Sequence, residues 1–337
     1  MDIYICCVEL YNTLRFNDVF VNERSMCSYC SAEINMRGFR ARWLTRVFLF
    51  IFATLILGWL ITPERLDRNI NSLKMLEKGN RVYRDVFLDL LKTFIEIADE
   101  LELVWFIHYG TLIGSWRHHG FVPWDDDIDI IVNLSQKDAL LSKIKSMNPY
   151  YMGEDGIPIV KFYSNRSSLK VPKSYHKWPF IDILFFEEDD DAILDNLRFM
   201  KNIHLQKSDV FPLHKRPFEG FLVNSPRRPM KLLVKIFHSS DPVKCATGEG
   251  SHRPGRDMPS VEVTCEALEN IFPFVHREFV DNIMKETLKL GDRALHTKYV
   301  DEEKDSLTLP YSFKPVNYVP GLLTRLEYLL HLKLYKT

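Results

Sequence analysis

Hydrophobic positions along the chain fall into one long uninterrupted run and several shorter periodic stretches. The long run, from Val47 to Ile61, contains no charged residue, and its neighbours extend it over residues 43–62. A stretch of about 20 apolar residues is long enough to cross a hydrocarbon core of about 30 Å. Arg46 lies near enough to one end for its side chain to reach the lipid headgroups. We therefore predict one transmembrane signal-anchor, with a long buried core helix as the alternative.

Charges on the two sides of this run predict its orientation. The N-terminal side carries a cluster of arginines, whereas acidic and basic residues are mixed on the other side. Basic residues favour the cytoplasmic side of a membrane, so we expect residues 1–42 in the cytoplasm, a polar stem over 63–80 and a lumenal body. Cys245 and Cys265 fall in that body, where an oxidising lumen permits a disulfide. The sequence does not decide whether they pair.

The pattern after the stem mixes helical and strand periodicity. Apolar residues recur at helical spacing over 81–103, 229–237 and 265–290. A brief helix is expected to begin near Gly110 and to end around His118, with Gly120 as its stop signal. Another helix starts at Ser135, where Asp138 completes a capping pattern. The serine-, glycine- and proline-rich stretch 239–259 indicates a loop. Short apolar or alternating runs predict strands over 104–108, 127–132, 157–162, 180–186 and 217–223. We expect an α+β fold with a mixed sheet flanked by helices.

The amino-acid composition excludes several classes of protein. The chain has 337 residues, 46% of them hydrophobic, which excludes a disordered chain, a collagen-like repeat and a polytopic membrane protein. Lys plus Arg (44) and Asp plus Glu (45) nearly cancel, so no basic excess indicates a nucleic-acid partner. The body is therefore expected to be an enzyme-sized globular domain.

Three aspartates carry the candidate chemistry. Asp127 and Asp129 are two residues apart on a predicted strand, so both carboxylates project from the same face. Asp182 is the one charged residue in the apolar strand Phe180–Phe186, and a buried carboxylate requires a metal, a Lys or an Arg as partner. Carboxylates grouped in this way suit Mg²⁺ or Mn²⁺. A calcium-binding loop starting at Asp125 does not fit, because its sixth position is not glycine.

A phosphate-binding helix start is predicted just upstream. Gly110 and Gly114 bracket the beginning of the short helix, where free backbone N–H groups favour anions. Arg117 on the same helix either faces a diphosphate or forms a salt bridge. His118 and His119 are interpreted as helix-end or surface residues rather than ligands. Metal carboxylates beside such a helix start indicate phosphoryl or nucleotidyl transfer.

The segment Tyr109–Ile130, Y-G-T-L-I-G-S-W-R-H-H-G-F-V-P-W-D-D-D-I-D-I, resembles the signature of the LicD/fukutin family of nucleotidyltransferase-fold phosphotransferases. The strand around Asp182 and the P-F-E-G motif at Pro217–Gly220 fit the same family. The resemblance covers roughly residues 85–240. It implies a catalytic domain over 81–240 with a nucleotidyltransferase-like mixed sheet, followed by a loop and helical extension over 241–337.

The resemblance also implies an activity. A phospho-alcohol such as phosphocholine or ribitol phosphate would pass from a CDP-activated donor to a hydroxyl of a glycan or glycoprotein acceptor, with release of CMP. Asp127 and Asp129 would hold Mg²⁺ or Mn²⁺ with Asp125 nearby, and Asp182 would be a third ligand or the catalytic base. Gly110 and Thr111 would contact the donor phosphates. Animal relatives are type II Golgi membrane proteins, which agrees with the predicted anchor.

Two other functions compete with this one. A Golgi glycosyltransferase with a D-x-D metal site normally has an apolar strand before that motif, whereas Pro123-Trp124 precede it here. A non-catalytic lumenal glycan-binding protein would need none of the three carboxylates, yet all are present. Release of CMP from a CDP-alcohol would separate the phosphotransferase from both alternatives.

Overall fold

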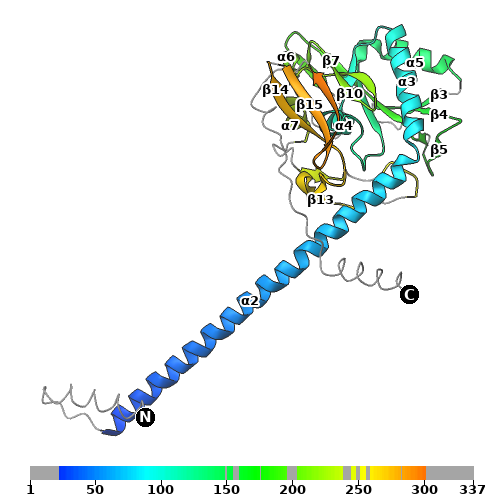
Figure 1. Cartoon of the computed structure of the whole chain (residues 1–337). Helices are drawn as coiled ribbons and strands as arrows, with labels where there is room; N and C mark the ends of the chain where they lie inside the picture. Colours follow the sequence, from blue (N-terminus) through cyan, green and yellow to red (C-terminus); the bar gives the residue numbers. More distant parts are fainter. Residues whose placement is uncertain are drawn as a thin grey trace. The chain divides into compact units, whose positions relative to one another are not determined.

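The computed structural model of the chain describes residues 23–148, 150–154, 159–174, 176–195, 203–237, 244–247, 251–255, 259–281 and 283–300 (Figure 1). The chain divides into two units, Met1–Arg65 with Pro320–Thr337 and Leu66–Val319. The candidate site belongs entirely to the second unit. The side chains of residues 1–42, the predicted cytoplasmic segment, lie outside the described part of the chain.

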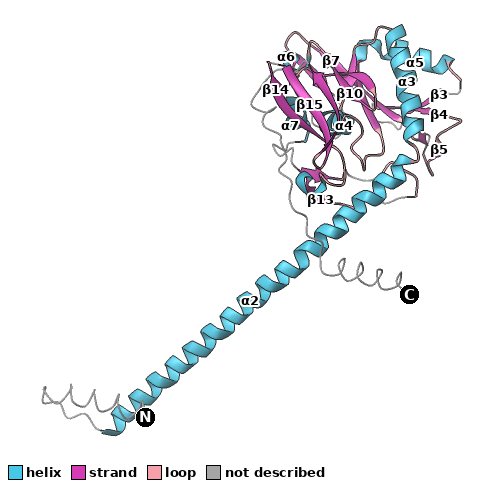
Figure 2. Cartoon of the chain, viewed as in Figure 1, coloured by secondary structure: helices cyan, strands magenta, loops and turns pink. Residues whose placement is uncertain are grey.

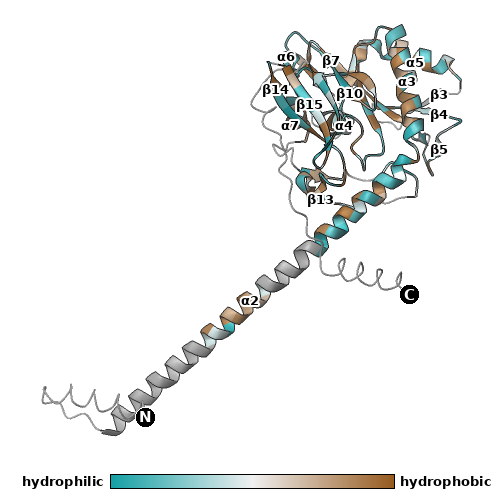
Figure 3. Ribbon diagram, viewed as in Figure 1, coloured by the Kyte–Doolittle hydropathy of each residue, from teal (hydrophilic) through white to brown (hydrophobic). Residues whose placement is uncertain are grey.

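The α2 helix (Glu23–Arg81) contains the predicted membrane span. Large apolar side chains from Phe48 to Phe52 are exposed, and five consecutive helical residues point to every side of the helix axis. Figure 3 colours the described middle part of α2 largely as hydrophobic. The side chains of residues 55–62, the rest of the span, lie outside the described part. No helix among the described residues is long and apolar enough to cross a membrane. The membrane span stays a prediction.

The last turns of α2 pack into the second unit. Ile70, Leu73 and Leu76 follow one another at intervals of three residues and are buried in a cluster with Trp124 and Phe274. Such a stripe is the buried face of an amphipathic helix. From residue 66 onward the predicted polar stem is therefore a packed helix: Arg68, Lys74 and Lys78 lie on its exposed face, although Asp67 is buried, and these charges obscured a regular apolar stripe.

A mixed sheet forms the centre of the second unit (Figure 2). Its main path is β1-β2-β7-β4-β3, with β8 beside β7 and β9 beside β8. The β2 and β7 strands are parallel, and the other pairings of this sheet are antiparallel. The bounds are β1 Trp105–Ile107, β2 Ile128–Asn133, β3 Tyr150–Glu154, β4 Val160–Ser164, β7 Ile181–Glu188, β8 Ala192–Asp195 and β9 Ile203–Gln206. The α+β class and the predicted strands of this sheet are confirmed, whereas β3, β8 and β9 were not predicted.

Helices flank this sheet as expected. The α3 helix buries the apolar stripe that predicted it, and α4 packs against β2 and α7. The left-handed residue that ends α4 is His119 (φ 53°), one position before the predicted stop at Gly120. Before α5, Asn133 caps the turn by accepting a hydrogen bond from the Ser135 N–H, so Ser135 is not the cap. The bounds are α3 Arg84–Glu100, α4 Tyr109–His118, a 3₁₀ turn Leu134–Gln136, α5 Lys137–Ser146, α6 Lys207–Val210 and α7 Pro229–Phe237.

Several two-stranded pieces complete the unit. The P-F-E-G motif is the turn of a hairpin, in which Glu219 and Gly220 both have positive φ (48° and 86°), as a two-residue hairpin turn requires. The β12 and β13 strands pair within the region predicted as loop and its flank, and a disulfide joins Cys245 of β12 to Cys265, the residue after β13. The bounds are β5 Leu169–Lys170, β6 Lys177–Trp178, β10 His214–Phe218, β11 Phe221–Ser225, β12 Lys244–Ala246 and β13 Glu262–Thr264.

The predicted helix over 265–290 is wrong. After a 3₁₀ turn (Cys265–Leu268), the chain forms the antiparallel sheet β14 (Phe274–Val280), β15 (Ile283–Leu290) and β16 (Arg293–Val300). Burial along β15 alternates with period two, the strand period, and Asp281 has the positive φ (50°) of a tight hairpin turn. Apolar residues spaced by two also fall at i and i+4, which produced the helical interpretation.

Buried charged residues connect this sheet to the segment Tyr109–Ile130. The Glu286 carboxylate is fully buried and lies 2.7 Å from Arg216, 2.8 Å from Arg277 and 2.7 Å from His119 Nε2. Arg277 also lies 3.8 Å above the Trp116 ring. Because Glu286 is on β15, Arg216 on β10 and His119 at the end of α4, one carboxylate links three elements distant in sequence.

Candidate active site

The predicted aspartates meet where β2 lies beside β7. Asp127 immediately precedes β2, Asp129 lies within it, and Asp182 is the second residue of β7. The two strands are parallel, and their register places Asp129 opposite Asp182. The structure thus brings the third carboxylate beside the D-x-D strand, as the sequence led us to expect.

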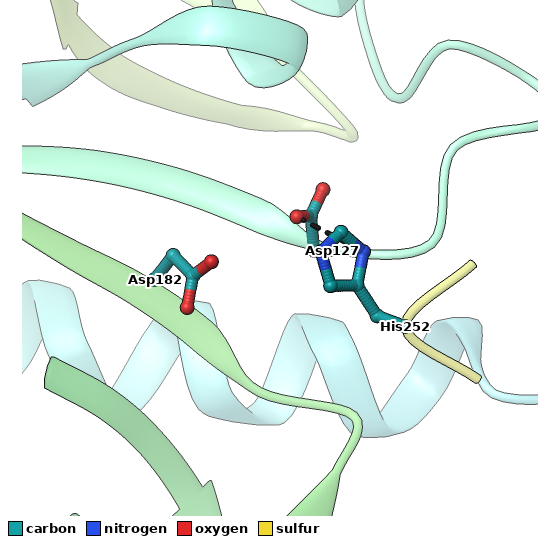
Figure 4. A group of neighbouring side chains, drawn as sticks. All are labelled: Asp127, Asp182 and His252. Atoms are coloured by element: carbon teal, nitrogen blue, oxygen red, sulfur yellow. Dashed lines mark ion pairs between the residues drawn. The ribbon is translucent and has the colours of Figure 1, made fainter. Parts of the chain in front are cut away.

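Asp127 and Asp182 form a compact group with His252 (Figure 4). One carboxylate oxygen of each aspartate and one ring nitrogen of His252 all lie within 4.8 Å of one another. Both aspartates are buried, and His252 Nδ1 is 3.4 Å from Asp127 Oδ2. Burial raises the pKa of Asp127; the charge of His252 opposes this rise, and the neighbouring Asp182 carboxylate adds to it.

The group fits a divalent cation. Ligand atoms about 2.1 Å from an ion such as Mg²⁺ lie at most about 4.2 Å apart. The three donor atoms satisfy this limit after shifts of a few tenths of an ångström, well within side-chain motion. Two carboxylates and one imidazole are ordinary ligands for divalent ions. Asp127 and Asp182 are therefore the aspartates that this geometry offers most directly to a metal.

Lys161 neutralises Asp182 from the strand on its other side. The antiparallel register of β4 and β7 places Lys161 opposite Asp182, and its Nζ is 2.7 Å from Asp182 Oδ1. The same ammonium lies 3.8 Å above the ring of Phe180. The expectation that a buried Asp182 needs a metal, a Lys or an Arg is thus met by Lys161, which no sequence spacing identified.

Asp126, which no sequence argument singled out, fixes the segment that carries His252. Its carboxylate accepts hydrogen bonds from Ser251 Oγ (2.6 Å), from the backbone N–H groups of His252 and Arg253, and from His252 Nδ1 (2.9 Å). Burial alone would raise the pKa of Asp126, but the hydrogen bonds and charge of His252 hold it below its usual range. Although burial opposes it, the Asp127 and Asp126 carboxylates raise the pKa of His252 to about 9.

Asp125 and Asp129 approach the start of α4. The Gly110 N–H donates to Asp129 Oδ2 (3.1 Å), and the Asp129 N–H donates to Thr111 Oγ1 (2.7 Å). A Cβ at Gly110 would lie 2.4 Å from Asp125 Oδ2, so glycine is needed for this approach. Burial and the nearby Asp127 raise the pKa of Asp125 well above its usual range. Gly110 and Thr111 therefore position a carboxylate, and their contact with donor phosphates stays a prediction.

Gly114 and Arg117 serve packing in this structure. A Cβ at Gly114 would lie 2.3 Å from the Gly120 carbonyl oxygen, so glycine lets α4 contact the following loop. The Arg117 guanidinium is buried and donates to Cys245 Sγ (3.4 Å) and to the Lys244 carbonyl (3.3 Å). The predicted contact of Gly114 and Arg117 with donor phosphates stays a prediction.

The histidines after Arg117 are not surface residues. His118 is buried, with Nδ1 2.6 Å from the Pro273 carbonyl oxygen, and burial lowers its pKa to about 3. His119 is buried beside Glu286. Both residues stand at the end of α4, as one of the two predicted locations requires, but they are buried because β14–β16 cover this end of the helix.

Comparison with known proteins finds a family match that includes the segment Tyr109–Ile130. Residues 102–228 match the family model LicD/FKTN/FKRP, nucleotidyltransferase domain, so the resemblance drawn from Tyr109–Ile130 is confirmed. The lipopolysaccharide cholinephosphotransferase LicD of Haemophilus influenzae is 42% identical over 48 residues, 14% of this chain and 18% of that protein. The uncharacterized protein RT0683 of Rickettsia typhi is 25% identical over 163 residues, 45% of each protein.

Among solved structures, the lincosamide antibiotic adenylyltransferase LnuA with bound lincomycin aligns with a TM-score of 0.31 and 12% identity, over 45% of this chain and 85% of that one. The chain spans less than half the length of the curated relatives named above.

Proposed function

We propose that this protein transfers a phospho-alcohol, of the phosphocholine or ribitol phosphate type, from a CDP-activated donor to a glycan hydroxyl and releases CMP. The observation that carries the proposal is the grouping of Asp127 and Asp182 on adjacent strands of a LicD-type domain, within reach of a single cation. Mg²⁺ or Mn²⁺ bound there would neutralise charge on the donor phosphates.

The reaction forms one P–O bond and breaks another. The acceptor hydroxyl oxygen attacks the phosphorus that bears the alcohol, the bond from that phosphorus to CMP breaks, and the hydroxyl proton passes to a base. Asp182 beside Asp127 is the candidate metal ligand, and Lys161, 2.7 Å away, keeps its carboxylate oriented on β7. The alternative role of Asp182 is that of the base that takes this proton.

The proposed setting is the lumen of the Golgi or endoplasmic reticulum, with the chain anchored through residues 43–62 in a type II orientation. Two features support it. The exposed apolar side chains around α2 at residues 48–52 suit lipid better than water. The Cys245–Cys265 disulfide suits an oxidising compartment.

The test uses the full chain in detergent with a panel of CDP-alcohols, a mixture of glycan acceptors and Mg²⁺ or Mn²⁺. Metal-dependent release of CMP is the expected result. Release of a nucleoside diphosphate from a sugar nucleotide would instead favour the D-x-D glycosyltransferase. Glycan binding with neither product would favour the non-catalytic binding protein.

Asparagine variants of the aspartates test which of them the transfer reaction needs. Asp127→Asn and Asp129→Asn should each slow transfer at least about a hundredfold, since about 1.4 kcal/mol of lost transition-state stabilisation is tenfold in rate. Asp182→Asn should also abolish transfer; if metal affinity survives, Asp182 is the base, and if it falls, Asp182 is a ligand. Asp125→Asn should have a smaller effect. Asp138→Asn on the exposed surface of α5 is the matched control. Near-full transfer by both the Asp127 and Asp129 variants would refute the assignment.

A further inference from the structure

We propose that His252, held by Asp126, is a protein ligand of the cation at Asp127 and Asp182, and that this imidazole makes the site prefer a transition-metal ion over Mg²⁺. The inference deepens the proposed function and rests on it for the identity of the site. It concerns a segment beyond residues 102–228, the part that matches the family model.

The geometry places the imidazole among the donors. A ring nitrogen of His252 and one oxygen from each of Asp127 and Asp182 lie within 4.8 Å of one another. Figure 4 shows the His252 ring beside Asp127, with the Asp182 side chain projecting from the neighbouring strand toward the same space. The ring of Phe180 packs edge-on against the imidazole, with centroids 5.5 Å apart and planes at 85°, which restricts its rotation.

Asp126 supplies the support that a metal-binding histidine needs. Histidine ligands commonly donate their second ring N–H to a carboxylate, which fixes the tautomer and the ring orientation. His252 Nδ1 lies 2.9 Å from Asp126 Oδ1 and 3.4 Å from Asp127 Oδ2. With the Nδ1–H donating to Asp126, the ion would take Nε2. The Asp126 carboxylate also accepts hydrogen bonds from Ser251 Oγ and from the backbone N–H groups of His252 and Arg253. One carboxylate therefore fixes the whole segment. Trp178 Nε1 in turn donates to the Asp126 carbonyl (2.7 Å).

The donor set decides which ion is preferred. Mg²⁺ favours oxygen ligands and binds imidazole weakly, whereas first-row transition metals accept imidazole readily, with affinities rising from Mn²⁺ through Co²⁺. Two carboxylates alone would leave Mg²⁺ competitive. Adding one imidazole favours Co²⁺ and Mn²⁺, so the expectation of an oxygen-only site from the sequence is incomplete.

Metal binding by the full chain tests the inference without any assay of transfer. Co²⁺, Mn²⁺ and Mg²⁺ affinities are measured by calorimetry, and the visible spectrum of bound Co²⁺ reports nitrogen coordination. The wild-type protein should bind Co²⁺ at least about a hundredfold more tightly than Mg²⁺. His252→Gln should lower the Co²⁺ affinity at least tenfold, change the Mg²⁺ affinity by less than about threefold, and shift the Co²⁺ spectrum.

Two further variants and a control separate ligation from folding. Asp126→Asn should lower Co²⁺ affinity about tenfold to a hundredfold, the usual effect of losing such a support, and Asp182→Asn should weaken all three ions. His204→Gln, at an exposed histidine on β9, should change nothing. Thermal unfolding of each variant confirms that it is folded.

The outcomes for this inference and for the proposed function are distinct. If His252→Gln leaves the Co²⁺-to-Mg²⁺ ratio and the spectrum unchanged while CMP is still released, His252 is not a ligand and the proposed function stands. If the ratio falls as expected but no CDP-alcohol yields CMP, the metal site stands and the proposed function fails. Equal Mg²⁺ and Co²⁺ affinities in the wild-type protein overturn the inference directly.

Discussion

Replacing Glu286 with glutamine should destabilise the protein strongly, because this carboxylate neutralises two buried guanidinium groups. Arg216 and Arg277 lie 2.7 Å and 2.8 Å from Glu286 Oε1, with side-chain exposures of 2% and 1%. Removing one partner of a buried charge network leaves the others uncompensated and costs about 3–5 kcal/mol. Glutamine keeps one oxygen acceptor, so we expect the free energy of unfolding to fall by about 3 kcal/mol. That is a large part of the total for a typical domain, which is about 5–15 kcal/mol.

The assay is urea unfolding of the full chain followed by tryptophan fluorescence. Trp116 is a suitable probe, because Arg277 stacks on its ring at 3.8 Å. Glu278→Gln is the matched control: Glu278 is on the same sheet, is exposed and pairs only at the surface with Lys285, so its loss should leave the unfolding midpoint unchanged. A difference between the two variants identifies burial, rather than loss of charge, as the cause.

The pH dependence gives a second check. Although burial raises the pKa of Glu286, Arg216 and Arg277 together hold it well below its usual value of 4.5. A depressed carboxyl pKa contributes stability that is present above the unfolded-state value, about 4.3, and is lost as the pH falls through the folded-state value. The difference in free energy of unfolding between wild type and Glu286→Gln should therefore stay constant from pH 8 to about pH 5.5 and shrink under stronger acid. A difference below about 1 kcal/mol at pH 7 would refute the reasoning.

Three other predictions concern the same unit. Gly114→Ala should lower stability by about 2 kcal/mol or more, since its Cβ would meet backbone atoms at 2.3 Å and 2.9 Å; thermal melting checks this, and a shift under 2 °C would contradict it. Replacing both Cys245 and Cys265, 20 residues apart, with serine should lower the free energy of unfolding by about 3 kcal/mol, and wild type under reductant should match the variant. Asn133-Leu-Ser and Asn165-Arg-Ser are acceptor triplets for N-glycosylation. In animal cells, Asn165→Gln should abolish a glycosidase-sensitive mobility shift and Asn133→Gln should not, because Asn165 is exposed whereas Asn133 caps a turn and donates to Glu188; the opposite pattern would refute this assignment.

The sequence alone determined whatever depends on local pattern. The alternation around Asp127 and Asp129 predicted β2, the proline-initiated apolar stripe predicted α7, and the signature Tyr109–Ile130 indicated the LicD-type domain. Each of these rests on neighbours within one element, where spacing and geometry are directly related. The same local rule failed over 265–290, because apolar positions there fit both the strand and the helix period.

Only the tertiary structure decided which side chains share the site. Asp182 meets Asp127 because β7 pairs in parallel with β2, and Lys161 meets Asp182 because β4 pairs with β7 in one register. His252 reaches them from a segment held by the Asp126 carboxylate, which lies 126 residues earlier in the chain. Strand order, register and loop anchoring depend on the free energy of packing the whole unit. No short-range spacing carries that information, so the histidine and the lysine beside the aspartates became identifiable only once the chain was folded.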